Sequence, residues 1–308
     1  MPPSVAPASR RQQNAGRVRS AFIAAFLAPA VALYAVFVIW PVAQAFAFSL
    51  YRWRGVSEHR TFVGLENFAR LAADPVFRQA LSHNLFFLLV GGAAIMTLGL
   101  AIAHAVHGEG RFVRALRGVY LFPQIISGVV VAILWMFIYN PSFGVLNGTL
   151  KRIGLGALAF DWLGTPRTAL PAVTVTFVWH AVGFYIMLFS AGLRTIPAEV
   201  HEAALLDGVE GLRRFRTITL PMLWGVMRVA MVYVVINALN VFALVFLMTV
   251  GGPDRRTETM LTYLYEQAFK NSEFGYGTAL AVANFAIVML LSGAVMALFR
   301  HNPQEAKA

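Results

Sequence analysis

A polar segment between residues 194 and 228 carries the side chains with the clearest potential for chemistry. Glu202 offers a carboxylate that can pair with a basic group on another surface. The next two residues, Ala203 and Ala204, are small enough to let such a surface approach closely. A carboxylate beside small residues is a pattern for docking rather than for catalysis. We therefore expect this segment to bind a partner.

Catalytic and metal-dependent chemistry has little support in the sequence. His201 and Glu202 begin the His-Glu-x-x-His pattern of zinc proteases, but Leu205 stands where the second histidine belongs. The chain has no cysteine, and it lacks the Gly-Lys pair of a phosphate-binding P-loop. An enzyme acting on lipid would need a carboxylate, a metal cluster or an activated nucleophile near a span end, and we find no such constellation. We predict no catalytic residue, metal or cofactor on this chain.

The docking segment contains local start and stop patterns for helices. Pro197 suits a first helical turn, Glu199 complements the positive end of a helix dipole, and Gly208 permits a left-handed stop. These residues predict a short helix over 197–207. A second helical piece over 212–218 follows after a turn. It leaves three arginines available to lipid headgroups or acidic groups: Arg213, Arg214 and Arg216.

The rest of the chain must supply the elements that hold this segment, and its composition indicates membrane spans. Hydrophobic residues make up 58% of the 308 residues and charged residues only 13%. A helix needs about 20 apolar residues to cross the hydrocarbon core. The fold class that follows is all-α, a polytopic transmembrane bundle of about six spans. Six windows of at least 25 residues contain no Asp, Glu, Lys or Arg: 20–51, 79–108, 118–150, 168–193, 229–253 and 274–299.

Basic residues are spread over the short connectors between these windows. The formal net charge is +11, and such a distribution favours anionic lipid headgroups as the partner rather than nucleic acid. Six spans place both termini on one side, and Arg17 and Arg19 before the first window favour the cytoplasm. The 194–228 connector then faces the cytoplasm as well. The predicted domains are a disordered cytoplasmic tail (1–19), a permease domain (20–299) and a second cytoplasmic tail (300–308).

A cleaved signal peptide is the alternative for the first window. Residues 22–39 follow a basic tail, and Ala45 and Ala47 could form a cleavage pair. The apolar run is longer than the usual h-region of about 7–15 residues. Trp40 and Trp53 have the character of interfacial anchors. We therefore expect the first span to be retained.

The docking segment resembles the coupling loop of the inner-membrane permeases of ATP-binding-cassette importers. Those permeases carry Glu-Ala-Ala, three residues, Gly, nine residues and Ile-x-Leu-Pro, and every fixed position is matched here. Three further segments are similar to the carbohydrate-type branch: 62–68, 251–253 and 275–279. The resemblance identifies the candidate coupling residues as Glu199, Glu202, Ala203, Ala204, Asp207, Gly208, Ile218, Leu220 and Pro221.

The resemblance also implies partners. It implies a coupling helix seated in a cleft of one of two ATP-binding-cassette ATPase subunits, which bind the ATP. It further implies a second permease subunit, a different chain, and an extracytoplasmic solute-binding protein. The expected location is the cytoplasmic membrane of a bacterium or archaeon. The implied solutes are sugars, oligosaccharides, polyols or glycerol phosphates.

Candidates for the solute path are amides within the spans. Asn237 and Asn240 share one face of the fifth window, and Asn284 lies in the sixth. Amides in membranes also act as links between helices, and both roles stay open. A secondary transporter without an ATPase partner is the alternative function. The absence of charges from the spans speaks against it, since only imidazoles such as His180 remain as titratable groups at membrane depth.

Overall fold

A computed structural model describes residues 9–106, 118 and 120–300 of the chain. Their regular elements are helices, apart from a two-stranded antiparallel sheet of β1 (Tyr51–Arg52) and β2 (Thr61–Phe62). The predicted disordered tail is wrong for residues 9–19, because α1 already begins at Ser9 and runs to Tyr34. Alanine, arginine and glutamine are good helix formers, and a helix already nucleated in the adjoining span propagates into them. The rest of that tail and residues 301–308 lie outside the described residues.

About six membrane crossings are confirmed. Within the described residues, five helical segments are long and apolar enough to span: Phe22–Phe48, Pro75–Ala105, Ala169–Arg194, Trp224–Met248 and Phe274–Leu298. The third window instead holds helical residues 120–125 followed by the shorter helix α7 (Gly128–Tyr139). The helix is interrupted between them at Ser127, which has an extended backbone. Its Oγ accepts a hydrogen bond from Val129 N (3.4 Å). The third crossing is therefore made of two pieces.

Several crossings are divided further by short π-helical stretches. The first comprises α1, η1 (Ala35–Ile39) and α2 (Trp40–Phe48), and the second comprises α4 (Pro75–Phe86), η2 (Phe87–Gly91) and α5 (Gly92–Ala105). The stretch η1 ends two residues before Pro41 and contains Phe37, the residue four positions before this proline. A proline removes one N–H and clashes with the carbonyl four residues earlier, so a local widening of the helix accommodates it. The remaining crossings are α9 (Ala169–Arg194), α13 (Trp224–Leu239) with α14 (Ala243–Met248), and α16 (Phe274–Leu298).

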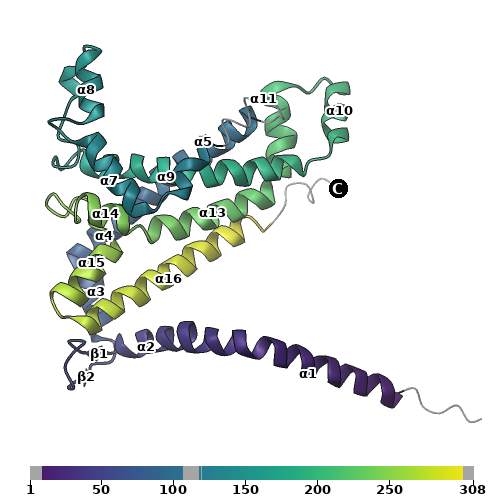
Figure 1. Cartoon of the computed structure of the whole chain (residues 1–308), viewed down its shortest axis with the longest axis vertical. Helices are drawn as coiled ribbons and strands as arrows, with labels where there is room; N and C mark the ends of the chain where they lie inside the picture. Colours follow the sequence, from purple (N-terminus) through teal and green to yellow (C-terminus); the bar gives the residue numbers. More distant parts are fainter. Residues whose placement is uncertain (1–8, 107–117, 119, 301–308) are drawn as a thin grey trace, which may run out of the picture.

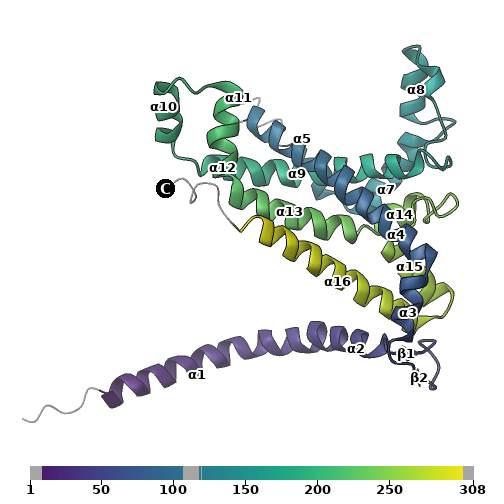
Figure 2. The ribbon, with the colours of Figure 1, turned by 180° about the vertical axis from the view of Figure 1, so that it is seen from behind.

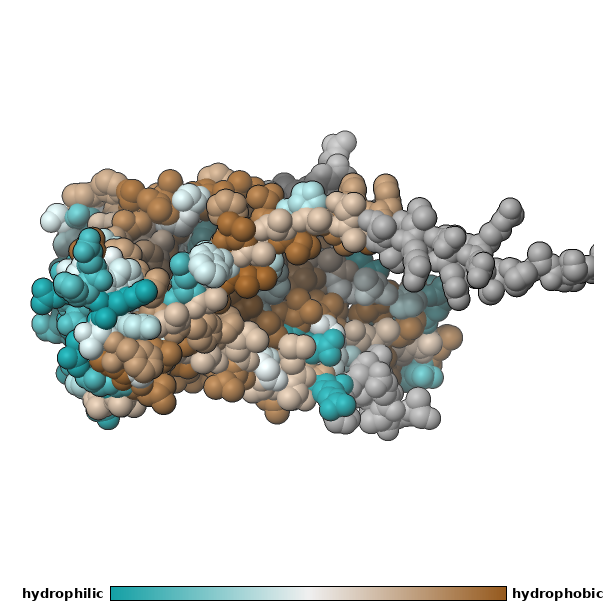
Figure 3. All heavy atoms as spheres, turned by 90° about the horizontal axis from the view of Figure 1, so that it is seen from below, coloured by the Kyte–Doolittle hydropathy of each residue, from teal (hydrophilic) through white to brown (hydrophobic). Residues whose placement is uncertain are grey.

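The connectors separate into two ends of the bundle (Figures 1 and 2). The start of α1, the end of α16 and the helices α10 (Ala198–Leu206) and α11 (Gly211–Arg214) lie at one end, which we call the loop end. The opposite end carries β1, β2, α3 (Glu66–Ala73), α8 (Val145–Arg152) and α15 (Met260–Tyr265). Figure 3 shows hydrophilic side chains gathered near β1 and β2 and a mostly hydrophobic surface between the ends. This distribution is that of a bundle standing in a bilayer.

The core of the bundle is built by close packing of α5, α9 and α13. Gly91 faces the ring of Phe177, and Gly99 lies against Tyr185 and Phe189 of α9. At Gly92 a Cβ would come within 2.5 Å of Val234 on α13. Small residues at these positions let the helices approach closely. The positions of α9 and α13, which enclose the docking segment in sequence, are thus fixed against each other.

The N-terminal helix stands apart from this core. In both ribbon views α1 runs away from the bundle, and none of the apolar side chains in its most hydrophobic window is buried (Figure 1). Only the α2 part packs on α16, for example through the edge-to-face pair Phe46 and Phe285 at 6.1 Å between ring centroids. The first crossing therefore presents an uncovered apolar surface along most of its length.

Candidate functional site

The first part of the docking segment is the helix α10, Ala198–Leu206. Pro197 is extended (φ −60°, ψ 143°) and forms its N-terminal boundary, so the helix begins one residue later than the sequence predicts. Glu199 lies in the first turn, where its charge complements the helix dipole. The local residues therefore fold into the expected element with almost the expected bounds.

The end of α10 is set by Gly208, whose φ is +68°. Val209 N donates to Ala204 O at 2.8 Å, and Gly208 N donates to Leu205 O at 3.1 Å. This pair of bonds is the Schellman arrangement, which requires a left-handed residue that glycine adopts without strain. A Cβ at Gly208 would meet nothing within 4 Å, so the constraint there is backbone conformation and not space.

The exposed face of α10 contains most of the predicted coupling residues. Glu199, Glu202, Ala203, Asp207 and Gly208 are exposed. Ala204 is an exception: it is only 3% exposed and turns toward the rest of the chain, so it cannot share a free surface with Ala203. Leu206 is 90% exposed at the tip of the helix, and the sequence gives no hint that this leucine stands free.

The inner side of the docking segment is anchored in the bundle core. Ile196 is buried just before α10, and Leu223 is buried just before α13. Both belong to the same cluster as the helix core, with Val200 of α10 packed against it. At Gly192 of α9 a Cβ would lie 2.9 Å from Leu223, so the last turn of α9 packs against the residue that precedes α13. The docking segment is therefore joined to both helices by packed side chains.

The second part of the docking segment consists of α11, η4 (Phe215–Thr219) and α12 (Leu220–Met222). The predicted helical piece is confirmed, although its last turns widen to π geometry before Pro221. Ile218, Leu220 and Pro221 are half-buried and Thr219 is buried. These residues of the motif thus lead the chain back into the bundle, whereas the exposed face belongs to α10.

The predicted solute-path amides lie around a break in the fifth crossing. α13 ends at Leu239, and the chain is not helical again until α14 begins at Ala243. Asn237 and Asn240 are exposed, and each donates to a carbonyl four residues earlier at 2.8 Å. Asn284 of α16 is buried and donates to Asn240 Oδ1 at 3.1 Å. Asn240 and Asn284 thus meet, while Asn237 bonds within its own helix and lies beside Tyr185 of α9.

A fourth amide, which the sequence reading misses, holds the broken crossing in place. Asn84 of α4 is fully buried and donates from Nδ2 to Ala238 O at 2.8 Å and to Leu239 O at 3.3 Å. Its Oδ1 accepts from Met260 N at the start of α15 (2.9 Å). One side chain therefore satisfies backbone groups of two different elements. Its place inside a charge-free window, next to Ser82 and His83, is the pattern that could have indicated this role.

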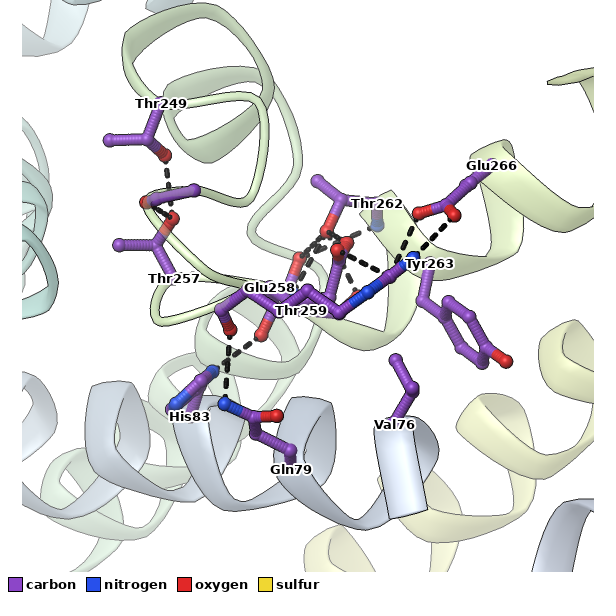
Figure 4. Close-up of polar contacts among 12 residues, drawn as sticks. Val76, Gln79, His83, Thr249, Thr257, Glu258, Thr259, Thr262, Tyr263 and Glu266 are labelled. Carbon is purple, nitrogen blue, oxygen red and sulfur yellow. Dashed lines mark hydrogen bonds and ion pairs between the residues drawn. The ribbon is translucent and has the colours of Figure 1, made fainter. Parts of the chain in front are cut away.

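The opposite end of the bundle is fixed by a polar network (Figure 4). His83 donates from Nδ1 to Glu258 O at 2.8 Å, tying α4 to the loop before α15. The Glu258 carboxylate accepts from Thr262 (2.5 Å) and from Arg255 (3.1 Å). Burial raises the pKa of Glu258, while the Thr262 hydrogen bond and the Arg255 charge act in the other direction. Arg255 also pairs with Glu266 at 2.6 Å. These mostly buried bonds hold the loop before α15 against α4.

Comparison with known proteins places the chain among transport permeases. The family model described as "Binding-protein-dependent transport system inner membrane component" matches residues 95–304. A probable ABC transporter permease protein YurN from Bacillus subtilis (strain 168) is 36% identical, covering 91% of this chain and 96% of that protein. The diacetylchitobiose uptake system permease protein NgcF from Streptomyces coelicolor is 34% identical, and the match covers 97% of this chain and 91% of that protein.

Solved structures agree on the fold. A chain of a bacterial ABC transporter involved in the import of the acidic polysaccharide alginate superposes with a TM-score of 0.78 at 22% identity, covering 94% of this chain and 98% of that one. A second alginate transporter structure, in complex with a periplasmic protein bound to an alginate pentasaccharide, gives a TM-score of 0.76. The chain belongs to the family of inner-membrane components of binding-protein-dependent transport systems.

Proposed function

We propose that this chain is one permease subunit of an ATP-driven importer of a sugar or related solute, with α10 as the helix that an ATPase subunit grips. The observation that carries this proposal is the geometry of α10. Its outer face is exposed, while the docking segment that contains it is anchored in the core at Ile196, just before α10, and at Leu223, just before α13. A surface helix resting on lipid would not need both flanks anchored in the core.

The proposed mechanism passes from α10 to the fifth crossing. ATP-driven closure of two ATPase subunits displaces α10, and the packing of Gly192 against Leu223 carries this displacement into α9 and α13. The break after Leu239 lets α13 move relative to α14. The bundle then shifts from inward-facing to outward-facing. Bound ATP supplies the energy on the partner subunits, and no cofactor is required on this chain.

The solute path in this proposal runs past the break in the fifth crossing. Interrupted helices at membrane depth are tolerated where the backbone is buried in protein or lines a cavity. Asn237 and Asn240 are exposed on the face that reaches this break, and Asn284 positions Asn240. Amide groups can donate to and accept from sugar hydroxyls. The relatives named for diacetylchitobiose and for alginate support a carbohydrate as the solute.

A second permease subunit completes the membrane domain in this proposal. None of the residues in the most hydrophobic window of the first crossing is buried, and α1 stands away from its own bundle (Figure 2). In the proposed complex, α1 packs on the second permease, and the rest of the 20–299 permease domain supplies the remaining contact surface for that partner. We propose that the partner is a different chain, so that each subunit supplies a different half of the solute path.

The location proposed for the importer is the cytoplasmic membrane, with the loop end in the cytoplasm together with both chain termini. The polar network around Glu258 then faces an extracytoplasmic solute-binding protein. A secondary transporter driven by an ion gradient fits less well. It would need a titratable group in the path, and the face around Asn240 carries amides instead.

Isolation of the protein with its native neighbours tests the proposal. Membranes are solubilised in mild detergent, the tagged full chain is purified, and the companions are identified by mass spectrometry. The expected result is a complex with two ATPase copies and one further permease. Uptake by the chain alone in proteoliposomes, driven by an ion gradient without any ATPase, would contradict it.

A further inference from the structure

An apolar cavity of about 660 Å³ opens beside the docking segment. Ligand sites in proteins commonly occupy about 300–1,000 Å³. Its walls come from the last turns of α5, from α11 with η4, and from the start of α13. The lining residues that matter below are Met96, Ala101, His104, Leu212, Phe215 and Met227.

The cavity reaches deep into the membrane-spanning part of the bundle. Met96 lies nine positions before Ala105, the last residue of α5, and this separation is about 14 Å along the axis at 1.5 Å per residue. A water-soluble partner at the loop end cannot fill a cavity of that depth. The occupant must be a hydrocarbon chain or another membrane helix.

Two arginines next to lining residues in sequence favour a lipid. Arg213 and Arg216 are three positions apart and flank the lining residues Leu212 and Phe215. Both arginines are exposed, and neither forms an ion pair with any residue that the structure describes. Guanidinium groups bind phosphate oxygens through paired hydrogen bonds. A second membrane helix would not need two cations at this depth.

A histidine adds a polar wall to the same cavity. The His104 ring lies 4.8 Å from the Phe215 ring, centroid to centroid, so α5 and η4 meet at this point. His104 is exposed and can donate a hydrogen bond to a phosphate or ester oxygen. The arrangement is an apolar slot closed at the membrane surface by groups that bind anions.

We propose that this cavity binds an anionic phospholipid, with one acyl chain between α5 and α13 and the phosphate on Arg213 and Arg216. A lipid held there touches the docking segment on its membrane side. The proposal requires only that the chain spans a bilayer with the loop end at its surface, and it does not depend on ATPase docking. It therefore stands or falls separately from the proposed function.

The test uses the full chain, with its co-purifying subunits, in detergent with added dioleoyl phosphatidylglycerol or dioleoyl phosphatidylcholine. Native mass spectrometry counts the lipids retained. We expect phosphatidylglycerol to be retained preferentially. In the Arg213→Gln/Arg216→Gln variant, the apparent affinity for phosphatidylglycerol is expected to fall by about tenfold or more. The apparent affinity of this variant for phosphatidylcholine is expected to stay unchanged. Arg152→Gln, which removes a charge at the opposite end, is the matched control and is expected to bind like the wild type.

A second variant tests the acyl slot without changing charge. Ala101 is exposed on α5 and lines the cavity, so Ala101→Phe fills the slot and is expected to reduce retention of both lipids. Unchanged phosphatidylglycerol binding in the double arginine variant would overturn the proposal. So would an efficient cross-link from Ala101→Cys to another membrane subunit, because a protein helix would then occupy the slot. The chain has no other cysteine to confuse that result.

Discussion

The side-chain amide of Asn84 donates to the carbonyl of Ala238 at 2.8 Å, across 154 positions of sequence. This bond satisfies one of the carbonyls left free where α13 ends at Leu239. In hydrocarbon such a group has no water to bond with. The break in the fifth crossing can therefore exist only because a residue of the second crossing supplies the donor.

Replacing Asn84 with leucine should destabilise the chain markedly. The substitution leaves two buried carbonyls and the Met260 N–H without a partner, and each unsatisfied group costs about 1–3 kcal/mol. We expect a clear drop in the thermal midpoint of unfolding in detergent, as measured by intrinsic fluorescence. Ser82→Ala is the control on the same helix, because Ser82 bonds only within its own turn. Equal stability of the two variants would contradict this account.

Gly208 should tolerate asparagine but not valine. The left-handed φ of +68° costs a β-branched residue about 1–2 kcal/mol or more, whereas asparagine adopts it more readily. Gly208→Val is therefore expected to disturb the turn after α10 and to lower uptake at least tenfold while ATPase activity persists. Gly208→Asn is expected to stay near wild type. Since a Cβ meets nothing nearby, loss of function in both variants would indicate a steric contact with a partner instead.

Substitution of Asn240 separates a solute role from a structural one. Asn240 is exposed and accepts from the buried Asn284, so Asn240→Ala should weaken solute affinity severalfold and also lower the thermal midpoint, because the Asn284 amide loses its acceptor. Asn284→Ala, which removes a buried partner, should lower the midpoint as well. Transport KM in proteoliposomes and unfolding in detergent are measured on the same preparations. An unchanged KM for Asn240→Ala together with reduced stability would assign this amide to helix packing alone.

Asp74 should make the stability of the opposite end sensitive to acid. Burial alone would raise its pKa, but hydrogen bonds from the hydroxyls of Tyr263 and Tyr276 and from Val76 N outweigh it and hold the pKa below the ordinary 3.8. A depressed pKa contributes stability above that value, and this contribution is lost as pH falls through the folded-state pKa.

The thermal midpoint of the wild type is therefore expected to fall below about pH 4, and Asp74→Asn should already be less stable at pH 7 and show a flatter acid limb. Glu58→Gln, an exposed carboxylate at the same end, is the control and should leave the profile unchanged. A wild-type acid limb that survives in Asp74→Asn would contradict this assignment.

Local patterns predict the fold and the docking helix well, and long-range contacts explain the rest. Pro197 and Gly208 act within one turn of α10, so its bounds could be foreseen to within a residue. The break after Leu239 contains neither proline nor glycine, and it depends on Asn84 from another crossing. The inward turn of Ala204 likewise follows from packing and not from its neighbours in sequence. Both features depend on contacts between residues far apart in the sequence, and local patterns do not predict such contacts.

Site-specific cross-linking tests the central claim most directly. Leu206 is 90% exposed at the loop end and Val56 is 95% exposed at the opposite end, and the chain has no native cysteine. Leu206→Cys should cross-link to an ATPase subunit in the native complex and resist a membrane-impermeant maleimide added to cells. Val56→Cys should be labelled from outside and should not reach the ATPase. Labelling of the Leu206→Cys variant from outside, or no cross-link from it to any nucleotide-hydrolysing subunit, would contradict the account.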